Sequence, residues 1–266
     1  MSADRYSRQS FLGQFSEEQI ARCTVGVCGL GGGGSHVVQQ LAHIGFQNYV
    51  LYDDDPVEES NLNRLIGATS ADALAETSKL HLAKMMIYGL QPRASVRGFA
   101  CKWQDRPTAL RECQILFGCV DGYKGREELE IVCRRFLIHY IDIGMDVHGV
   151  EKPVIGGQVI LSSPGGPCMR CMGFLTDEKL AQDAARYGNA GARPQVVWPN
   201  GVLASAAVGL AVDLVTDWTR LRRSHAYLVY DGNESTLGDS VTLRGIKREC
   251  PHFSVTALGD PVVVDL

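Results

Sequence analysis

One glycine-rich stretch restricts the possible folds of this chain more than any other feature. Residues 25–27 form a short apolar run typical of a buried strand, and the pattern G-x-G-x-x-G follows at Gly29, Gly31 and Gly34. Apolar residues at helical spacing cover 37–44, and a second apolar run leads into the acids 53–55. This order of strand, glycine turn, helix, strand and acid predicts a βαβ unit that binds a nucleotide.

The physical basis of that prediction is how such a unit receives phosphate. Glycines let a nucleotide approach the backbone closely, and the helix N-terminus behind them offers unpaired N–H groups and a positive dipole end. An acid at the end of the second strand accepts hydrogen bonds from ribose hydroxyls. NAD, FAD and ATP all satisfy this description, and a glycine-rich turn also occurs where a backbone simply turns tightly.

The composition fits one large α/β domain or two small ones. The chain has 266 residues, of which 45% are apolar and 21% charged, and its formal net charge of -4 argues against a nucleic-acid partner. Its longest apolar run, 202–215, is too short to cross a bilayer and contains Asp213, so no membrane partner is expected. With no signal-peptide pattern, a cytoplasmic protein is expected, whose nine cysteines are thiols or metal ligands.

The remaining patterns alternate between strand and helix up to residue 143, which predicts a mostly parallel sheet. Strands are expected at 115–120, 137–143, 154–161 and 227–230, with short edge strands at 241–243 and 262–264. Helices are expected at 71–90, 125–136 and 201–218. The residues expected on the buried side of the first of these helices are Leu74, Leu82, Met85, Met86 and Leu90. Residues 176–200 are expected to form a long mobile loop.

Four polar residues stand where a nucleotide site would use them. Asn61 and Arg64 follow the acids in a turn-rich stretch, where they are either phosphate donors or ordinary loop residues. Lys79 lies on the expected helix, where a lysine is usually solvated. Asp121 follows the apolar run 115–120, at the carboxyl end of a strand, where ligands of doubly wound sheets bind.

The cysteines suggest a structural metal site. Cys168 and Cys171 form a C-x-x-C knuckle, and Cys250 and His252 follow about 80 residues later. Phe253 stands where a fourth cysteine would be expected, so His252 is the candidate fourth ligand of a zinc ion. The alternative is that these cysteines are buried thiols without a metal.

Taken together, these motifs resemble the ThiF/MoeB/HesA family, the relatives of ubiquitin-activating enzymes. The resemblance runs from Arg5 to about Cys250 and includes Arg5-Tyr-Ser-Arg8-Gln9, the glycine pattern, the acids 53–55, Asn61-Leu-Asn-Arg64, Lys79, Asp121 and the cysteine knuckle. It implies a Rossmann-like α/β fold with a largely parallel sheet and an antiparallel extension. The single domain would comprise an arm at 1–22, a nucleotide-binding half at 23–145 and a protein-substrate and zinc half at 146–266.

The resemblance also implies an activity, the ATP- and magnesium-dependent adenylation of the C-terminal glycine of a small ubiquitin-like or sulfur-carrier protein. The implied nucleotide contacts come from Gly29, Gly31, Gly32, Gly34, Asp53, Asp55, Asn61, Arg64 and Lys79. Asp55 would hold the ribose, and Asn61, Arg64 and Lys79 would contact the phosphates. Asp121 would coordinate magnesium. Because the family is typically dimeric, Arg8 would reach the site of the partner subunit in a homodimer.

Two departures from the family bear on its later steps. The chain has no cysteine between Cys171 and Cys250, where many members carry the acyl-accepting cysteine, so the adenylate would pass directly to another nucleophile. Leu65 stands where the family usually has glutamine. Two other functions are compatible with the glycine motif, a dinucleotide-dependent oxidoreductase and a non-catalytic scaffold. The first has no clear use for Arg64, and the second does not require Asp121.

Overall fold

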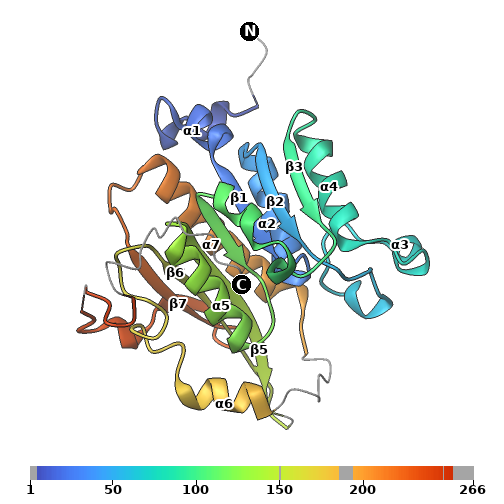
Figure 1. The fold of residues 1–266 in the computed structure, drawn as a ribbon. Coiled ribbons are helices and arrows are strands. Elements are labelled where there is room, and N and C mark those ends of the chain that lie inside the picture. Colours follow the sequence, from blue (N-terminus) through green and yellow to red (C-terminus); the bar gives the residue numbers. More distant parts are fainter. Residues whose placement is uncertain (1–4, 150, 186–193, 248, 254–266) are drawn as a thin grey trace.

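An eight-stranded sheet forms the centre of the computed structural model, which describes residues 5–149, 151–185, 194–247 and 249–253 (Figure 1). The strand order is β3-β2-β1-β4-β5-β6-β7-β8. The strands are β1 (Thr24–Cys28), β2 (Asn48–Tyr52), β3 (Ser95–Phe99), β4 (Ile115–Gly118), β5 (His139–His148), β6 (Val154–Ser162), β7 (His225–Asp231) and β8 (Thr236–Asp239). Strands β1 to β5 are parallel, and β6, β7 and β8 add to β5 in antiparallel register. The expected fold class is thereby confirmed.

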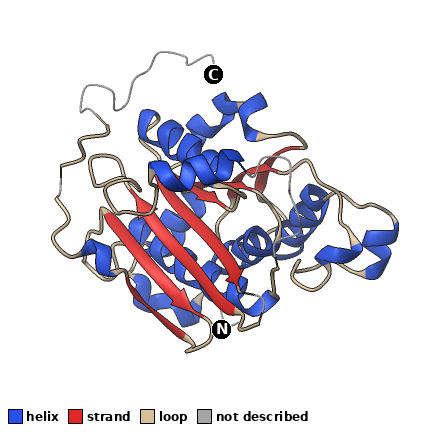
Figure 2. Ribbon diagram, turned by 90° about the horizontal axis from the view of Figure 1, so that it is seen from below, coloured by secondary structure: helices blue, strands red, loops and turns tan. Residues whose placement is uncertain are grey.

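Helices cover both faces of this sheet (Figure 2). They are α1 (Ser16–Arg22), α2 (Gly32–Ile44), α3 (Ser70–Leu74), α4 (Lys79–Leu90), α5 (Tyr123–Arg135), α6 (Asp177–Ala185) and α7 (Val197–Thr216). One hydrophobic core joins α1, α2, α4 and α7 to one face, and the other joins α5 and the cysteine knuckle to the opposite face. Alternation along β1 serves both cores, because Val25 and Val27 enter the first and Cys28 enters the second.

Helix α7 is the one helix among the described residues that is long and apolar enough to span a membrane. Half of its most apolar window is buried in the fold, where it packs against α2, β5 and β6. Asp213 in its last turns is 9% exposed, and its carboxylate accepts hydrogen bonds from the Thr219 backbone and hydroxyl. These contacts match those of a core helix in a soluble domain.

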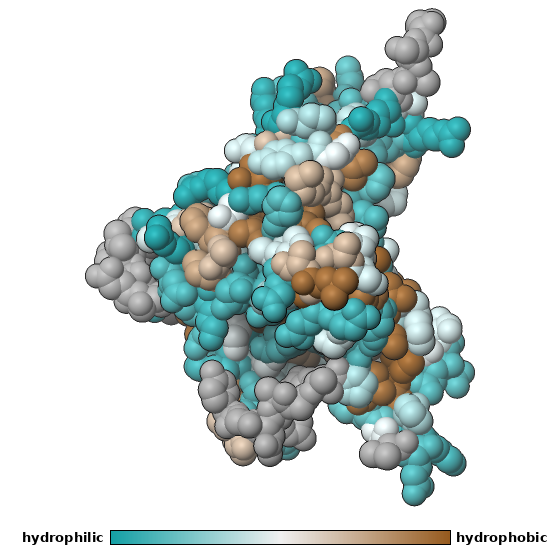
Figure 3. Space-filling view, turned by 90° about the vertical axis from the view of Figure 1, so that its right-hand side faces the viewer, coloured by the Kyte–Doolittle hydropathy of each residue, from teal (hydrophilic) through white to brown (hydrophobic). Residues whose placement is uncertain are grey.

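The expected helix at 71–90 is divided in two, and its expected buried side is only partly confirmed. Helix α3 ends at Leu74. Ser78 then forms an isolated antiparallel β-bridge with Pro56, and α4 begins at Lys79. Leu80 and Ile87 of α4 are buried, and Met86 and Leu90 pack against the same core as expected. Leu74 and Met85, which were also expected on the buried side, are 87% and 56% exposed, because the break changes which residues face the core. Figure 3 shows the resulting mixture of apolar and polar patches on the face that carries these helices.

Other differences concern short elements. The expected loop at 176–200 contains α6 and the first turn of α7, because its acidic and alanine-rich start favours a helix, and its residues 186–193 lie outside the described residues. The expected edge strand at 241–243 is a 3-10 helix, and the one at 262–264 lies outside the described residues. The patterns did not indicate β3 and β8, the two short edge strands, of which β3 is partly exposed and β8 is exposed throughout.

Candidate active site

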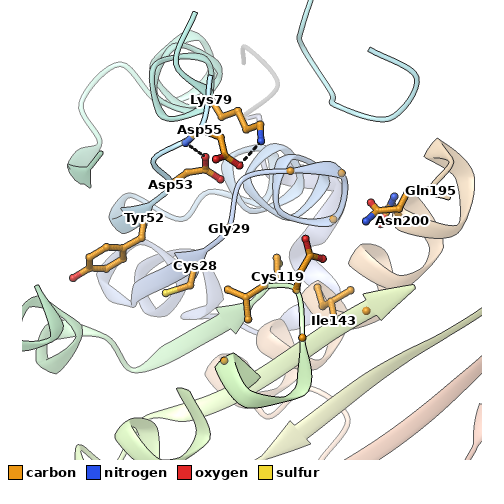
Figure 4. Close-up of a pocket in the computed structure, with 18 of the residues that line it drawn as sticks. Cys28, Gly29, Tyr52, Asp53, Asp55, Lys79, Cys119, Ile143, Gln195 and Asn200 are labelled. Atoms are coloured by element: carbon orange, nitrogen blue, oxygen red, sulfur yellow. Dashed lines mark hydrogen bonds and ion pairs between the residues drawn. The ribbon is translucent and has the colours of Figure 1, made fainter. Parts of the chain in front are cut away.

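A pocket opens at the carboxyl ends of the parallel strands, around the glycine turn between β1 and α2 (Figure 4). Its walls come from the segments that follow β1, β2, β3 and β4, from the middle of β5, and from the start of α7. The residues predicted for nucleotide and magnesium binding that line it are Gly29, Gly31, Gly32, Asp53, Asp55, Asn61, Arg64, Lys79 and Asp121. Segments up to about 170 residues apart in the chain, from Cys28 to Asn200, therefore meet at one site.

Glycine is present at each of the three motif positions for a different structural reason. Gly29 has φ +87°, and a Cβ there would lie 2.4 Å from the carbonyl oxygen of Cys119. Gly34 does not line the pocket, and its Cβ would lie 1.9 Å from the carbonyl oxygen of Gly29. A Cβ on Gly31 would meet no described atom within 4 Å, because Gly31 faces the pocket. The protein itself therefore needs glycine at 29 and 34, whereas only a ligand would need it at 31.

Asp53 holds the glycine turn in place. Its buried carboxylate accepts a hydrogen bond of 2.6 Å from the Leu30 backbone N–H and one of 3.0 Å from that of Asp55. Burial raises the pKa of Asp53, although these two hydrogen bonds and the nearby Lys79 oppose the increase. Both oxygens of the carboxylate thus bind backbone N–H groups at the pocket floor. This arrangement suits Asp53 to holding the glycine turn better than to contacting a ribose directly.

Asp55 and Lys79 form an ion pair at the pocket wall. Lys79 Nζ lies 2.8 Å from Asp55 Oδ2, and the Lys79 side chain is 11% exposed while that of Asp55 is 64% exposed. Their backbones are joined too, because the Lys79 N–H donates to the Asp55 carbonyl oxygen. Lys79 is therefore not solvated as most helix lysines are, and the first turn of α4 positions its ammonium group inside the site.

The segment after the acids forms a second cationic wall. Asn61 is 8% exposed and is held by a reciprocal cap in which the Glu58 N–H donates to its side-chain oxygen at 3.2 Å. Arg64 Nη1 donates to the Ser60 carbonyl oxygen at 2.7 Å and to Asn63 Oδ1 at 2.9 Å. Among the described residues, Nε and Nη2 of Arg64 make no hydrogen bond to protein, and the side chain lies against Gly32.

The opposite wall comes from β4, α5 and β5. Asp121 is exposed at the pocket mouth, immediately after β4. Arg126 of α5 is buried, lines the pocket, and pairs with the fully buried Asp142. Burial alone would lower the pKa of Arg126, but Asp142 outweighs that effect and raises it, so the guanidinium stays charged. Among the described residues, Asp121 makes no hydrogen bond or ion pair with protein, whereas the charge of Arg126 is neutralised by Asp142.

One predicted site residue lies outside the pocket, and two residues that line the pocket were not predicted from the sequence. Arg8 is exposed on the N-terminal arm and does not line the pocket of its own chain. The sequence patterns gave no indication of Arg126 or Asn200, which line the pocket from α5 and α7. The only available signal for Asn200 was its place at the start of an apolar helical run, which is also typical of a helix cap.

A second site lies on the other core, where the cysteine knuckle meets residues 250–252. Cys171 Sγ lies 3.6 Å from the sulfurs of both Cys168 and Cys250, and His252 Nδ1 lies 3.3 Å from the sulfurs of both Cys168 and Cys171. All four candidate ligand atoms lie within 4.8 Å of one another. A tetrahedral zinc ion places its ligand sulfurs about 3.8 Å apart, so this Cys3His set fits zinc, with His252 as the fourth ligand.

Helix α5 supports that knuckle with a buried polar network. Arg134, 1% exposed, donates to the carbonyl oxygens of Gly166 and Pro167 at 2.8 Å, directly before Cys168. Glu130 accepts the Met169 N–H at 2.9 Å. The Phe253 ring, at the position where a fourth cysteine was expected, lies over the Arg134 guanidinium at 5.4 Å.

Comparison with known proteins identifies the family. The model of the ThiF family matches residues 6–252. The chain belongs to the ThiF family. It is 30% identical over 216 residues to the SAMP-activating enzyme E1 of Haloferax volcanii, covering 79% of this chain and 76% of that protein. It is 26% identical to the sulfur carrier protein ThiS adenylyltransferase of Escherichia coli, covering 63% of this chain and 66% of that one.

The same fold occurs in solved crystal structures of Escherichia coli MccB. Escherichia coli MccB in a crystal structure with ATP superposes with a TM-score of 0.75 at 19% identity, over 96% of this chain and 74% of MccB. Relatives named ubiquitin-like modifier-activating enzyme 5 are longer, and the Bombyx mori protein is matched over 41% of its length. The relatives are named adenylyltransferases and activating enzymes, and this ThiF-family chain is an adenylyltransferase.

Proposed function

We propose that this ThiF-family enzyme uses ATP to adenylate the C-terminal glycine of a small ubiquitin-like or sulfur-carrier protein. The observation that carries the proposal is the convergence of Asp55, Arg64, Lys79 and Asp121 around a glycine turn whose Gly31 faces open space. A dinucleotide-dependent oxidoreductase would need the glycines and the acid, but it would not need two cations and a free carboxylate beside them.

In this proposal the nucleotide lies across the strand ends. Its ribose hydroxyls bind Asp55 at the end of β2, and its phosphates follow the glycine turn to the N-terminus of α2. Arg64 and Lys79 then face the phosphates from the two sides. Lys79 is already paired with Asp55 at 2.8 Å, so the ribose and phosphate contacts are prearranged by one ion pair.

The proposed reaction is an in-line displacement at phosphorus. A carboxylate oxygen of the partner's terminal glycine attacks the α-phosphorus of ATP, forming an acyl–phosphate bond. The bond between the α-phosphorus and the bridging oxygen breaks, and pyrophosphate leaves with that oxygen. Arg64 and Lys79 neutralise the charge that develops on the leaving group. Asp121 would hold a magnesium ion, which screens the phosphate charge when bound.

The partner is inferred from the relatives, whose names include a SAMP-activating enzyme and a ThiS adenylyltransferase. We infer a small protein partner with a flexible C-terminal glycine, because a flexible tail can enter the open pocket beside Asp121. No cysteine lies between Cys171 and Cys250, so the adenylate passes to a nucleophile outside this segment. The zinc ion is inferred to have a structural role, joining residues 168–171 to 250–252.

We also propose that the active form is a homodimer in which Arg8 completes the partner subunit's site. Its exposed position outside the pocket of its own chain supports this arrangement. Mixing two inactive variants, Arg8→Ala and Asp121→Asn, tests it, because each mixed dimer would contain one intact site. Recovery of activity on mixing supports the shared site, whereas an Arg8→Ala variant with full activity would contradict it.

The central experiment is ATP–pyrophosphate exchange with a panel of small proteins that end in Gly-Gly. We expect exchange with at least one partner, and we expect it to stop when the terminal glycine of that partner is deleted. Exchange reports adenylate formation alone, so a missing later step does not affect it. An enzyme that bound NAD in place of ATP, or ATP without exchange across the panel, would disprove the proposed activity.

A further inference from the structure

Asn200 is a buried polar residue of the pocket to which no role has been assigned so far. It lies in the first turn of α7, its side chain is 4% exposed, and it faces the glycine turn (Figure 4). Its Nδ2 donates to the Val196 carbonyl oxygen at 3.0 Å, which fixes the side-chain orientation. That hydrogen bond uses one of two amide protons, and among the described residues Oδ1 accepts none.

The Asn200 amide nitrogen lies beside Gly32, where the glycine turn joins the N-terminus of α2. An ideal Cβ on Gly32 would lie 2.7 Å from Asn200 Nδ2 and 3.4 Å from Arg64 Cδ, so both side chains meet at Gly32. Asn63 Nδ2 donates to the Gln195 carbonyl oxygen at 2.9 Å, which ties the segment of Arg64 to the start of α7. The amide and the guanidinium are therefore held beside one another by the fold.

Two helix N-termini add a positive potential at the same place. Helix α2 begins after Gly31 and α7 after Val196, and neither of these N-cap residues supplies a side-chain cap. Helix α7 is 20 residues long and packs against α2. A buried amide proton with no acceptor among the described residues, between two uncapped helix N-termini and an arginine, is suited to an anionic oxygen.

We propose that Asn200 donates its second amide proton to an oxygen of the β- or γ-phosphate of the nucleotide. The inference rests on the proposed function, in which ATP follows the glycine turn. The ribose acid Asp55 lies after β2, on one side of β1, whereas α7 packs against β5 and β6 on the other side. Asn200 therefore approaches the triphosphate from the side away from the ribose, where the terminal phosphates would lie.

The test compares nucleotides that differ only in phosphate number. Dissociation constants for ATP, ADP and AMP are measured by calorimetry for the wild type, for Asn200→Ala, and for Asn200→Leu, which keeps most of the side-chain volume. Loss of one hydrogen bond to a charged oxygen weakens binding about 10- to 100-fold. We expect that loss for ATP in either case and for ADP when the bonded oxygen belongs to the β-phosphate, with AMP changed by about twofold or less.

A matched control is Asn233→Asp, in the turn after β7, whose side chain bonds the Ile155 N–H and the Pro153 carbonyl oxygen outside the pocket. It should bind all three nucleotides as the wild type does. The inference would be overturned if the variants lost affinity for AMP as much as for ATP. It would also be overturned if both Asn200 variants bound ATP as tightly as the wild type does. If the wild type failed to bind ATP, the proposed function would fail first, and that outcome needs no variant to detect.

Discussion

Replacing Gly31 by alanine separates the needs of the fold from the needs of the ligand. The added Cβ meets no described atom within 4 Å, and the φ of Gly31, −71°, lies outside the positive range that favours glycine. At an N-cap, alanine lowers the free energy of unfolding by up to about 1 kcal/mol relative to glycine. Alanine also reduces the conformational entropy of the unfolded chain, which raises the free energy of unfolding by about 0.4–1 kcal/mol. The free energy of unfolding should therefore stay within about 1 kcal/mol of the wild type.

Nucleotide binding should respond very differently. A methyl group on Gly31 projects into the pocket, where the phosphates approach the backbone in the proposed complex. Displacing the phosphates from two backbone N–H donors removes about 1.5–3 kcal/mol for each bond, or roughly 3–6 kcal/mol together. This corresponds to a dissociation constant for ATP about 10²- to 10⁴-fold higher. Urea unfolding and calorimetric titration with ATP measure the two quantities separately.

Gly34→Ala is the matched control, because the same substitution in the same turn meets a different environment. Its Cβ would lie 1.9 Å from the Gly29 carbonyl oxygen, a backbone atom that cannot turn away. We expect this variant to lose at least about 1–3 kcal/mol of stability. Normal ATP affinity in Gly31→Ala would show that the nucleotide does not cross Gly31, and a Gly31→Ala variant as unstable as Gly34→Ala would refute the structural reasoning.

Three other predictions concern the site, the knuckle and the half-buried His139. Asp121→Asn and Arg64→Ala should each lower ATP–pyrophosphate exchange by about 10²- to 10³-fold with unchanged unfolding midpoints, and near-normal exchange in either would remove that residue from the mechanism. Elemental analysis should find zinc bound to the wild type and to Cys101→Ser, while Cys168→Ser should bind much less; equal zinc in all three would rule out the Cys3His site. Burial lowers the pKa of His139, so its contribution to stability is complete above the ordinary pKa near 6.5 and is lost as the pH falls toward the lowered folded value. Unfolding curves between pH 7 and 5 should therefore show a shallower loss of stability in His139→Gln, and an unchanged pH dependence would contradict this assignment.

Local patterns were sufficient where one short segment carries the information. The turn at 29–34 specifies its own strand, glycines and helix, because backbone conformation and helical spacing are properties of neighbouring residues. The same holds for the antiparallel strand β6 and for the cysteine knuckle. Local patterns failed at the helix expected over 71–90, where the bridge between Pro56 and Ser78 breaks the helix and changes which residues face the core.

The sequence by itself determined the βαβ unit, the order of the polar motifs and the presence of a C-x-x-C knuckle, since each lies within a segment of consecutive residues. Only the tertiary structure showed that His252 completes the knuckle, that Arg134 supports it, and that Asn200 faces Gly32. Those contacts join residues 30 to 170 positions apart. Sheet order and helix packing bring such residues together, and no local periodicity encodes that approach.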